Sequence, residues 1–184
     1  MSTTFPGTTI EATSLEKGSS KHLFNGIFAA GGITLSQVSI MTGLEPYSIQ
    51  NGVRRKFVAP PTKKLYSKQQ FSRIVIINML RETLQIDAIC NLISIIVGNP
   101  DDPTDDLIGD CELYHIFVDM IAEGNIDFTD KDSVKNAATT AAEGYSPDNA
   151  GKKTKLINIL QVMLYAHASS CLRDSSREML SHLY

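Results

Sequence analysis

The sequence has few of the features that mark secreted, membrane-bound or zinc-binding proteins. Its 184 residues contain only three cysteines, far apart and without a CxxC pair, so neither a disulfide framework nor a structural zinc site is expected. No apolar run approaches the ~18 residues that a membrane span requires. The first residues lack the charged and apolar regions of a signal peptide. These absences predict a soluble, cytoplasmic protein.

Sequence signatures of catalysis are also missing. The chain contains no G-x-S-x-G, P-loop, G-x-G-x-x-G or H-E-x-x-H motif. Ser169 and Asp174 lie near His167 in the sequence, but on one predicted helix, which is not the geometry of a catalytic triad. We therefore expect neither enzymatic activity nor a cofactor.

Acidic residues are absent from one long stretch of the chain. Between Pro46 and Arg81 there are eight Lys or Arg residues and no Asp or Glu. Residues 1–100 carry ten basic and five acidic side chains, a net charge of +5, whereas residues 101–184 carry seven and fifteen, a net charge of −8. Charge of one sign over a compact unit is typical of a surface that binds phosphate. Only the first half is therefore predicted to face nucleic acid.

Composition and periodicity divide the chain into four predicted segments. Residues 1–20 are rich in Ser, Thr and Gly without sustained periodicity, which predicts a disordered, mobile tail. Residues 21–98 are interpreted as a DNA-binding unit, residues 99–110 as a polar linker, and residues 111–184 as a helical dimerisation or effector domain. The predicted fold class is all-α with a small β-wing, in which an N-terminal winged helix-turn-helix precedes a C-terminal helical bundle.

Local signals place a helix-turn-helix near the start of the DNA-binding unit. Thr34 or Ser36 can cap a first helix. Gly43 supplies a turn where positive φ is often needed. Pro46 then begins a second helix, Pro46–Lys56, at a position where its missing N–H costs nothing. This second helix is the predicted recognition helix.

The segment after the recognition helix predicts a turn and then a long helix. Phe57–Pro61 cannot continue a helix, because proline lacks the N–H and disfavours helical conformation in the residue before it. Thr62–Tyr66 is predicted to form a short basic loop or β-wing. Ser67 followed by Gln70 resembles a capping box and opens a helix that reaches about residue 82.

Apolar spacing predicts further helices in the rest of the chain. In order, they are Ile86–Ile93, Leu113–Ile121, an alanine-rich helix from Asp130 or Asp132 to about Gly144, Leu156–Arg173, and a last short helix Ser175–His182.

Five short motifs follow one another in order between Thr34 and Ile89. They are T-L-S-Q-V-S-x-M-T-G-L from Thr34, Ser48-Ile49, Phe57-Val58-x-Pro60-Pro61, Tyr66-Ser67, and Leu80 and Leu84 followed by Q-I-D-x-I. The series covers residues 33–93 and resembles the MerR-like winged-helix family. The whole chain is similar to the YkrK-like family of uncharacterised bacterial proteins. This resemblance implies a transcriptional regulator. We further hypothesise that the protein binds duplex DNA as a homodimer on a two-fold-related site.

Two positions depart from the pattern of the resembling proteins. Those proteins usually carry an aromatic residue at the position of Gly52 and glycine at the position of Lys56. Glycine inside a helix lowers helix stability by about 0.5–1 kcal/mol relative to alanine. Lysine at position 56 adopts the left-handed conformation that ends a helix less readily than glycine does. We therefore expect DNA affinity to be lower than the pattern implies.

Twelve residues form the predicted DNA-binding set. Gln and Asn can pair with adenine in the major groove and Arg with guanine, while basic side chains and Tyr at the helix end and wing contact phosphates. The recognition helix offers Tyr47, Ser48, Gln50, Asn51 and Arg54; Arg55, Lys56, Lys63, Lys64 and Tyr66 are predicted phosphate contacts; Ser36 and Gln37 come from the first helix.

Two alternative functions remain open. The winged helix can be a degenerate scaffold, with a protein partner docking on the C-terminal helices, or the protein can be a small-molecule sensor with a pocket between its helical units. Gly52 and the acidic second half motivate the first alternative.

Metal binding is the weaker hypothesis. Three cysteines with His115 and His167 could converge to bind a metal, although no local spacing supports such a site. The acidic run Asp101–Glu112 lacks the glycine that a calcium-binding loop requires at its turn. We therefore predict no metal site.

Overall fold

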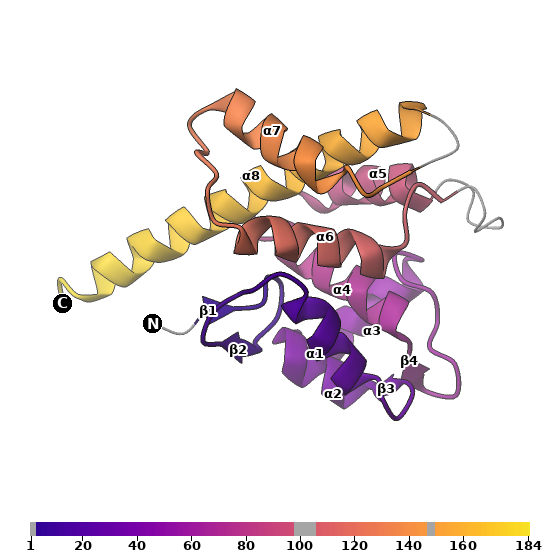
Figure 1. Ribbon diagram of the computed structural model, residues 1–184. Coiled ribbons are helices and arrows are strands. Elements are labelled where there is room, and N and C mark those ends of the chain that lie inside the picture. Colours follow the sequence, from indigo (N-terminus) through magenta and orange to yellow (C-terminus); the bar gives the residue numbers. More distant parts are fainter. Residues whose placement is uncertain (1–2, 98–105, 147–149) are drawn as a thin grey trace.

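The computed structural model describes residues 3–97, 106–146 and 150–184, and these are mostly helical with two small sheets. Figure 1 shows three tiers. The N-terminal elements form the lowest tier, and α4 (Lys68–Leu80) and α6 (Asp110–Ala122) form the middle one. Above them lie α5 (Ile86–Val97), α7 (Lys131–Ala141) and the first part of α8 (Ala150–Ser181). One hydrophobic cluster runs through all three tiers.

The first described residues fold as a hairpin, so the mobile tail expected for residues 1–20 is not what the structure shows. β1 (Thr3–Thr4) pairs antiparallel with β2 (Glu11–Ala12). Phe5, between them, is only 5% exposed. A segment that buries an aromatic side chain in the shared core is part of the domain.

Distant polar side chains hold the hairpin in place. The Tyr114 hydroxyl donates a hydrogen bond to the Pro6 carbonyl at 2.9 Å, and the Asn78 amide donates to the Gly7 carbonyl at 2.9 Å. Gly7 has φ 73°, and a Cβ there would lie 2.3 Å from the Val75 carbonyl oxygen. These partners are about 70 to 108 residues away in sequence, which is why local composition did not reveal them.

The next elements are short and closely spaced. They are α1 (Ser19–Ile27), β3 (Ile33–Thr34), α2 (Leu35–Thr42), α3 (Pro46–Arg54) and β4 (Leu65–Tyr66). Thr34 caps α2, Gly43 ends it with φ 69°, and Pro46 is the first residue of α3, as the local signals predict. α3 ends at Arg54, two residues before the predicted Lys56, which itself adopts a left-handed φ of 62°.

The stretch from Thr62 to Tyr66 forms a basic hairpin. β4 pairs antiparallel with β3, which precedes α2. Thr62 and Leu65 exchange two backbone hydrogen bonds, of 3.0 and 2.9 Å, so Lys63 and Lys64 form a two-residue turn. Both lysines have positive φ, 51° and 66°. Two successive positive φ values are the geometry of a type I′ turn.

Helix α4 lies at the centre of the fold. Its capping box joins Ser67 and Gln70, as predicted. Ile74, Val75 and Ile76 are successive residues, so they point in different directions around the helix, and all three are buried. A helix buried on most sides must be covered by several neighbours. α2, α6 and α8 all pack against it.

The C-terminal helices differ from the prediction at their ends. α7 (Lys131–Ala141) begins at the predicted cap Asp130 and stops before Gly144. α8 (Ala150–Ser181) is one continuous helix, whereas the sequence suggested a break before Ser175. The Ser175 hydroxyl donates to the Cys171 carbonyl at 2.9 Å instead of capping a new helix. Serine can make this hydrogen bond within a helix.

The predicted linker 99–110 lies partly outside the described residues. Its described part, residues 106–110, is packed and not solvated: Leu107 and Ile108 are each 5% exposed. Asp110 accepts two hydrogen bonds from Arg73 of α4, at 3.0 and 2.7 Å. α6 therefore starts against α4.

None of the helices within the described ranges is long and apolar enough to cross a membrane.

Candidate nucleic-acid interface

Helix α3 exposes most of its polar residues. Ile49 is 3% exposed and fixes the inner face. On the outer face, Tyr47 is 63% exposed and the Arg54 guanidinium lies 5.3 Å from the centroid of the Tyr47 ring. This cation–π contact orders an arginine that otherwise remains accessible.

The residues beside this outer face divide between two pockets. On the side of the basic hairpin, Gln50 and Arg54 line a groove with Lys64. On the opposite side, Ser48, Asn51 and Arg55 line a second pocket with residues of α4 and α5. The structure thus brings Arg54 and Gln50 together with the hairpin, while Asn51 and Arg55 lie on the other flank.

Five basic side chains from α3, its end and the hairpin form what we call the basic set: Arg54, Arg55, Lys56, Lys63 and Lys64. All are exposed. Over residues 3–97, 106–146 and 150–184, none of them makes a salt bridge. Unpaired exposed charges of one sign raise the local positive potential and attract polyanions.

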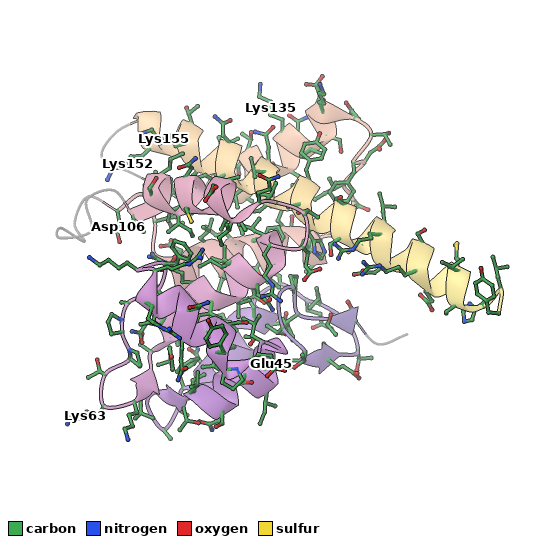
Figure 2. The ribbon with its side chains drawn as sticks, turned by 180° about the vertical axis from the view of Figure 1, so that it is seen from behind. Glu45, Lys63, Asp106, Lys135, Lys152 and Lys155 are labelled. Carbon is green, nitrogen blue, oxygen red and sulfur yellow. The ribbon has the colours of Figure 1, made fainter. Side chains whose placement is uncertain are left out.

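The tip of the hairpin is strained. Lys63 and Lys64 both occupy the left-handed region, where a non-glycine residue costs roughly 1–2 kcal/mol. Figure 2 shows Lys63 at an outer corner of the molecule, far from Lys135 and Lys155 at the other end. Strained residues that persist at an exposed tip are typical of functional sites.

Tyr66 is where the structure departs most from the predicted set. It is only 2% exposed, and burial raises the pKa of its phenol. Tyr66 belongs to the hydrophobic core cluster, so it supports the fold and does not present itself to a phosphate. The alternation of Leu65 and Tyr66 in the strand could have indicated this, because successive strand side chains point to opposite faces.

Ser36 and Gln37 are exposed at the start of α2. The Gln37 carbonyl oxygen accepts a hydrogen bond from the Thr34 backbone N–H at 2.8 Å, and Thr34 caps Gln37 in return. Gln37 is thus half of a capping box. The T-x-x-Q spacing signals this role in the sequence.

Arg81 and Glu45 are the charged residues near the site that sequence reasoning missed. Arg81, at the end of α4, lines the pocket that Arg55 also lines. Glu45 precedes α3 and is exposed. No local pattern links Arg81 to α3; only the packing of α4 behind α3 does.

Two of the three cysteines each lie beside a histidine, in two separate pairs. The Cys111 sulfur lies 3.1 Å from His115 Nε2, and the Ser20 hydroxyl lies 2.8 Å from His115 Nδ1. Cys171 lies 3.6 Å from His167. Within the part of the chain that the structure describes, no three potential metal ligands gather.

Burial disfavours the charged forms of both pairs. It lowers the pKa of both histidines and raises the pKa of the Cys111 and Cys171 thiols. A thiol held above its ordinary pKa is a poor nucleophile. The calcium hypothesis for Asp101–Glu112 falls largely outside the described residues.

A family model described as "Domain of unknown function (DUF1836)" matches residues 33–117. This agrees with the predicted similarity to a family of uncharacterised proteins. No curated protein and no solved structure matches the chain. The matched region continues past the predicted linker and ends within α6, so it includes both partners of the Arg73–Asp110 contact.

Proposed function

We propose that the protein is a DNA-binding transcriptional regulator. α2, the turn at Gly43 and α3 act as a MerR-like helix-turn-helix, and the basic hairpin acts as its wing. The basic set carries this proposal, because its five charges are exposed and none is in a described salt bridge. Basic side chains left unpaired on one compact unit are suited to phosphates.

In this proposal α3 enters the major groove. Tyr47, Gln50 and Arg54 face outward or toward the hairpin and read base edges together with Asn51 and Ser48. Arg55, Lys56, Lys63 and Lys64 contact the phosphates on either side. Tyr66 is left out of the interface because it is buried.

We further propose that a homodimer binds the DNA, with contacts through α8. The last part of this helix extends beyond the body of the molecule (Figure 1). Tyr165, Leu172 and Met179 recur every seven residues and are 39, 72 and 71% exposed. An exposed apolar seven-residue repeat is suited to pairing with a second copy of the same helix. The two half-sites should then lie about 34 Å apart, or a multiple of it.

The first test is selection from random duplex DNA by the full chain at two salt concentrations, with sequencing of the bound fraction. We expect an enriched two-fold-symmetric site and steep salt dependence. The variant Arg54→Ala/Arg55→Ala should bind weakly, and it should lower the salt slope by about 1, because Arg55 is a phosphate contact and each such contact contributes roughly 0.9.

Two further variants make this test specific. Lys135→Ala/Lys155→Ala removes the same charge at the opposite end of the molecule (Figure 2) and should leave affinity almost unchanged. Glu45→Gln removes an acid beside α3 and should strengthen binding. Equal losses of duplex affinity in both double variants would show that only the net charge of the protein determines binding. Absence of salt-sensitive binding in the unaltered protein would favour a protein-interaction module built on the same scaffold.

A further inference from the structure

A pocket of about 260 Å³ opens behind α3, between that helix, α4 and the first residue of α5. Its walls are mainly apolar and include Phe57, Ile74, Ile77 and Ile86. Pockets of this kind, apolar with a few polar groups, are where proteins bind small molecules. The predicted sensor pocket lay between the two helical units; this one lies within the N-terminal unit.

Gly52 contributes to the opening of the pocket. It lies in the interior of α3 and lines the pocket, and a Cβ placed there would meet only Val58, at 3.9 Å. Glycine is unfavourable inside a helix by about 0.5–1 kcal/mol. Its backbone here does not need positive φ. The packing therefore leaves room for a side chain that the sequence does not supply, and that room is part of the pocket.

The charged groups on the pocket wall are both arginines. Arg55 comes from the end of α3 and Arg81 from the end of α4, and no acidic residue among those described lines the pocket. Arg55 is in no salt bridge within the described ranges. Within the same ranges Arg81 approaches Glu82 at 4.0 Å, and Glu82 also pairs with Arg173 at 2.9 Å. The pocket therefore combines apolar walls with two arginines that retain hydrogen-bonding capacity.

We propose that this pocket binds a small organic monocarboxylate with a compact apolar body. The apolar part would lie against Phe57 and Ile77, in the space beside Gly52. The carboxylate would be held by Arg55 and Arg81, since guanidinium groups match carboxylate geometry. A pocket with two guanidinium groups and apolar walls should bind an amphiphilic anion more tightly than an inorganic one.

The ligand would also act on DNA binding, a step that rests on the proposed function. Arg55, Asn51 and Ser48 line the pocket and belong to the predicted DNA-binding set. A bound carboxylate places one negative charge beside Arg55 and Arg81 and so lowers the positive charge behind α3. Ligand and DNA therefore compete for one charge, and each lowers the affinity of the other by the same factor.

Binding is tested without DNA, by titrating the isotope-labelled full chain with phenylacetate and with isovalerate in NMR experiments. Each acid is paired with its neutral amide, phenylacetamide or isovaleramide. We expect at least one acid to shift the Gly52 amide and the Nε–H signals of Arg55 and Arg81, with its amide about tenfold weaker. No shift with either acid at millimolar concentration, or equal binding of acid and amide, overturns the proposal.

Substitutions at Gly52 locate the site without threatening the fold. Gly52→Phe fills the space and should abolish binding, while Gly52→Ala removes the helix penalty but leaves most of the pocket open and should retain binding. Arg55→Gln and Arg81→Gln should each lower the affinity for the acid about tenfold. Arg54→Gln lies outside this pocket and should leave that affinity unchanged. Binding that survives Gly52→Phe places the ligand elsewhere and overturns the proposal.

The effect on DNA is measured separately, with the duplex selected above. Saturating acid should lower duplex affinity in the unaltered protein and have no effect in Gly52→Phe. Acid binding that leaves duplex affinity unchanged overturns the regulatory part. A protein that binds the acid but no duplex contradicts the proposed function and leaves the pocket standing, so the two failures are distinguishable.

Discussion

The arginines that pair with acidic residues and the arginines of α3 have opposite surroundings. Arg73 of α4 lies in the interior and makes two hydrogen bonds to Asp110, and Arg173 of α8 pairs with Glu82 at 2.9 Å. Arg54 and Arg55 of α3 are exposed, and no salt bridge to either is found in the described chain. One pair of arginines joins helices that are far apart in sequence; the other pair remains available to a ligand.

This difference separates charges that support the fold from charges that serve function. A buried ion pair costs much to break, because its remaining partner is left unpaired. Removing an exposed charge changes the folding stability little. Stability therefore does not explain why exposed basic residues cluster on one unit. The prediction from sequence counted eight basic residues between Pro46 and Arg81 as one surface. The structure removes Arg73 from that surface.

The largest effect is expected at Arg73. Arg73→Ala leaves the Asp110 carboxylate buried without its partner, which should lower the free energy of unfolding by about 3–5 kcal/mol. Urea denaturation measures this loss. Arg54→Ala should change stability by less than about 0.5 kcal/mol. Similar losses in the two variants would remove the distinction between the two groups of arginines.

A smaller effect of opposite sign is expected at the hairpin. Lys63→Asn/Lys64→Gly supplies the residues that a type I′ turn favours, so stability should rise by roughly 1–2 kcal/mol. The same change removes two charges from the basic set and should weaken duplex binding. Thermal unfolding and DNA titration of one sample test both. A variant that gains stability and keeps its affinity would exclude the wing from the interface.

Acid should destabilise the folded protein through two histidines, His115 and His167. Burial lowers the pKa of His115 and His167 below the ordinary value of 6.5, so the unfolded chain takes up protons that the folded chain does not. The contribution of the two histidines to folding stability is fully present above pH 6.5. It is lost as the pH falls through their lower pKa values in the folded protein. His115→Gln should flatten the stability profile between pH 7.5 and 5, while His22→Gln, at an exposed site, should not. An identical profile for both would place the effect elsewhere.

The smallest effect on monomer stability is expected at the projecting part of α8. Met179→Glu changes a side chain that is 71% exposed, so unfolding should shift by less than about 0.5 kcal/mol. If α8 pairs with a second copy, light scattering should find the unaltered protein dimeric and the Met179→Glu variant monomeric. A dimer that persists in the variant would mean that another surface is used.

Several local features were predictable because their causes lie within a few residues. The Ser67–Gln70 capping box, the turn at Gly43 and the proline at the start of α3 all appear where the sequence indicates. Each depends on hydrogen bonds or backbone preferences between near neighbours, which one sequence contains in full.

By itself the sequence determined the helices, their caps and the concentration of basic residues between Pro46 and Arg81. Only the tertiary structure decided that the first residues are anchored by Tyr114 and Asn78, that Tyr66 is buried, and that Arg55 and Arg81 line one pocket. Helix signals come from residues up to four positions apart. Burial and pocket shape come from partners tens of residues away, whose proximity exists only once the helices pack together.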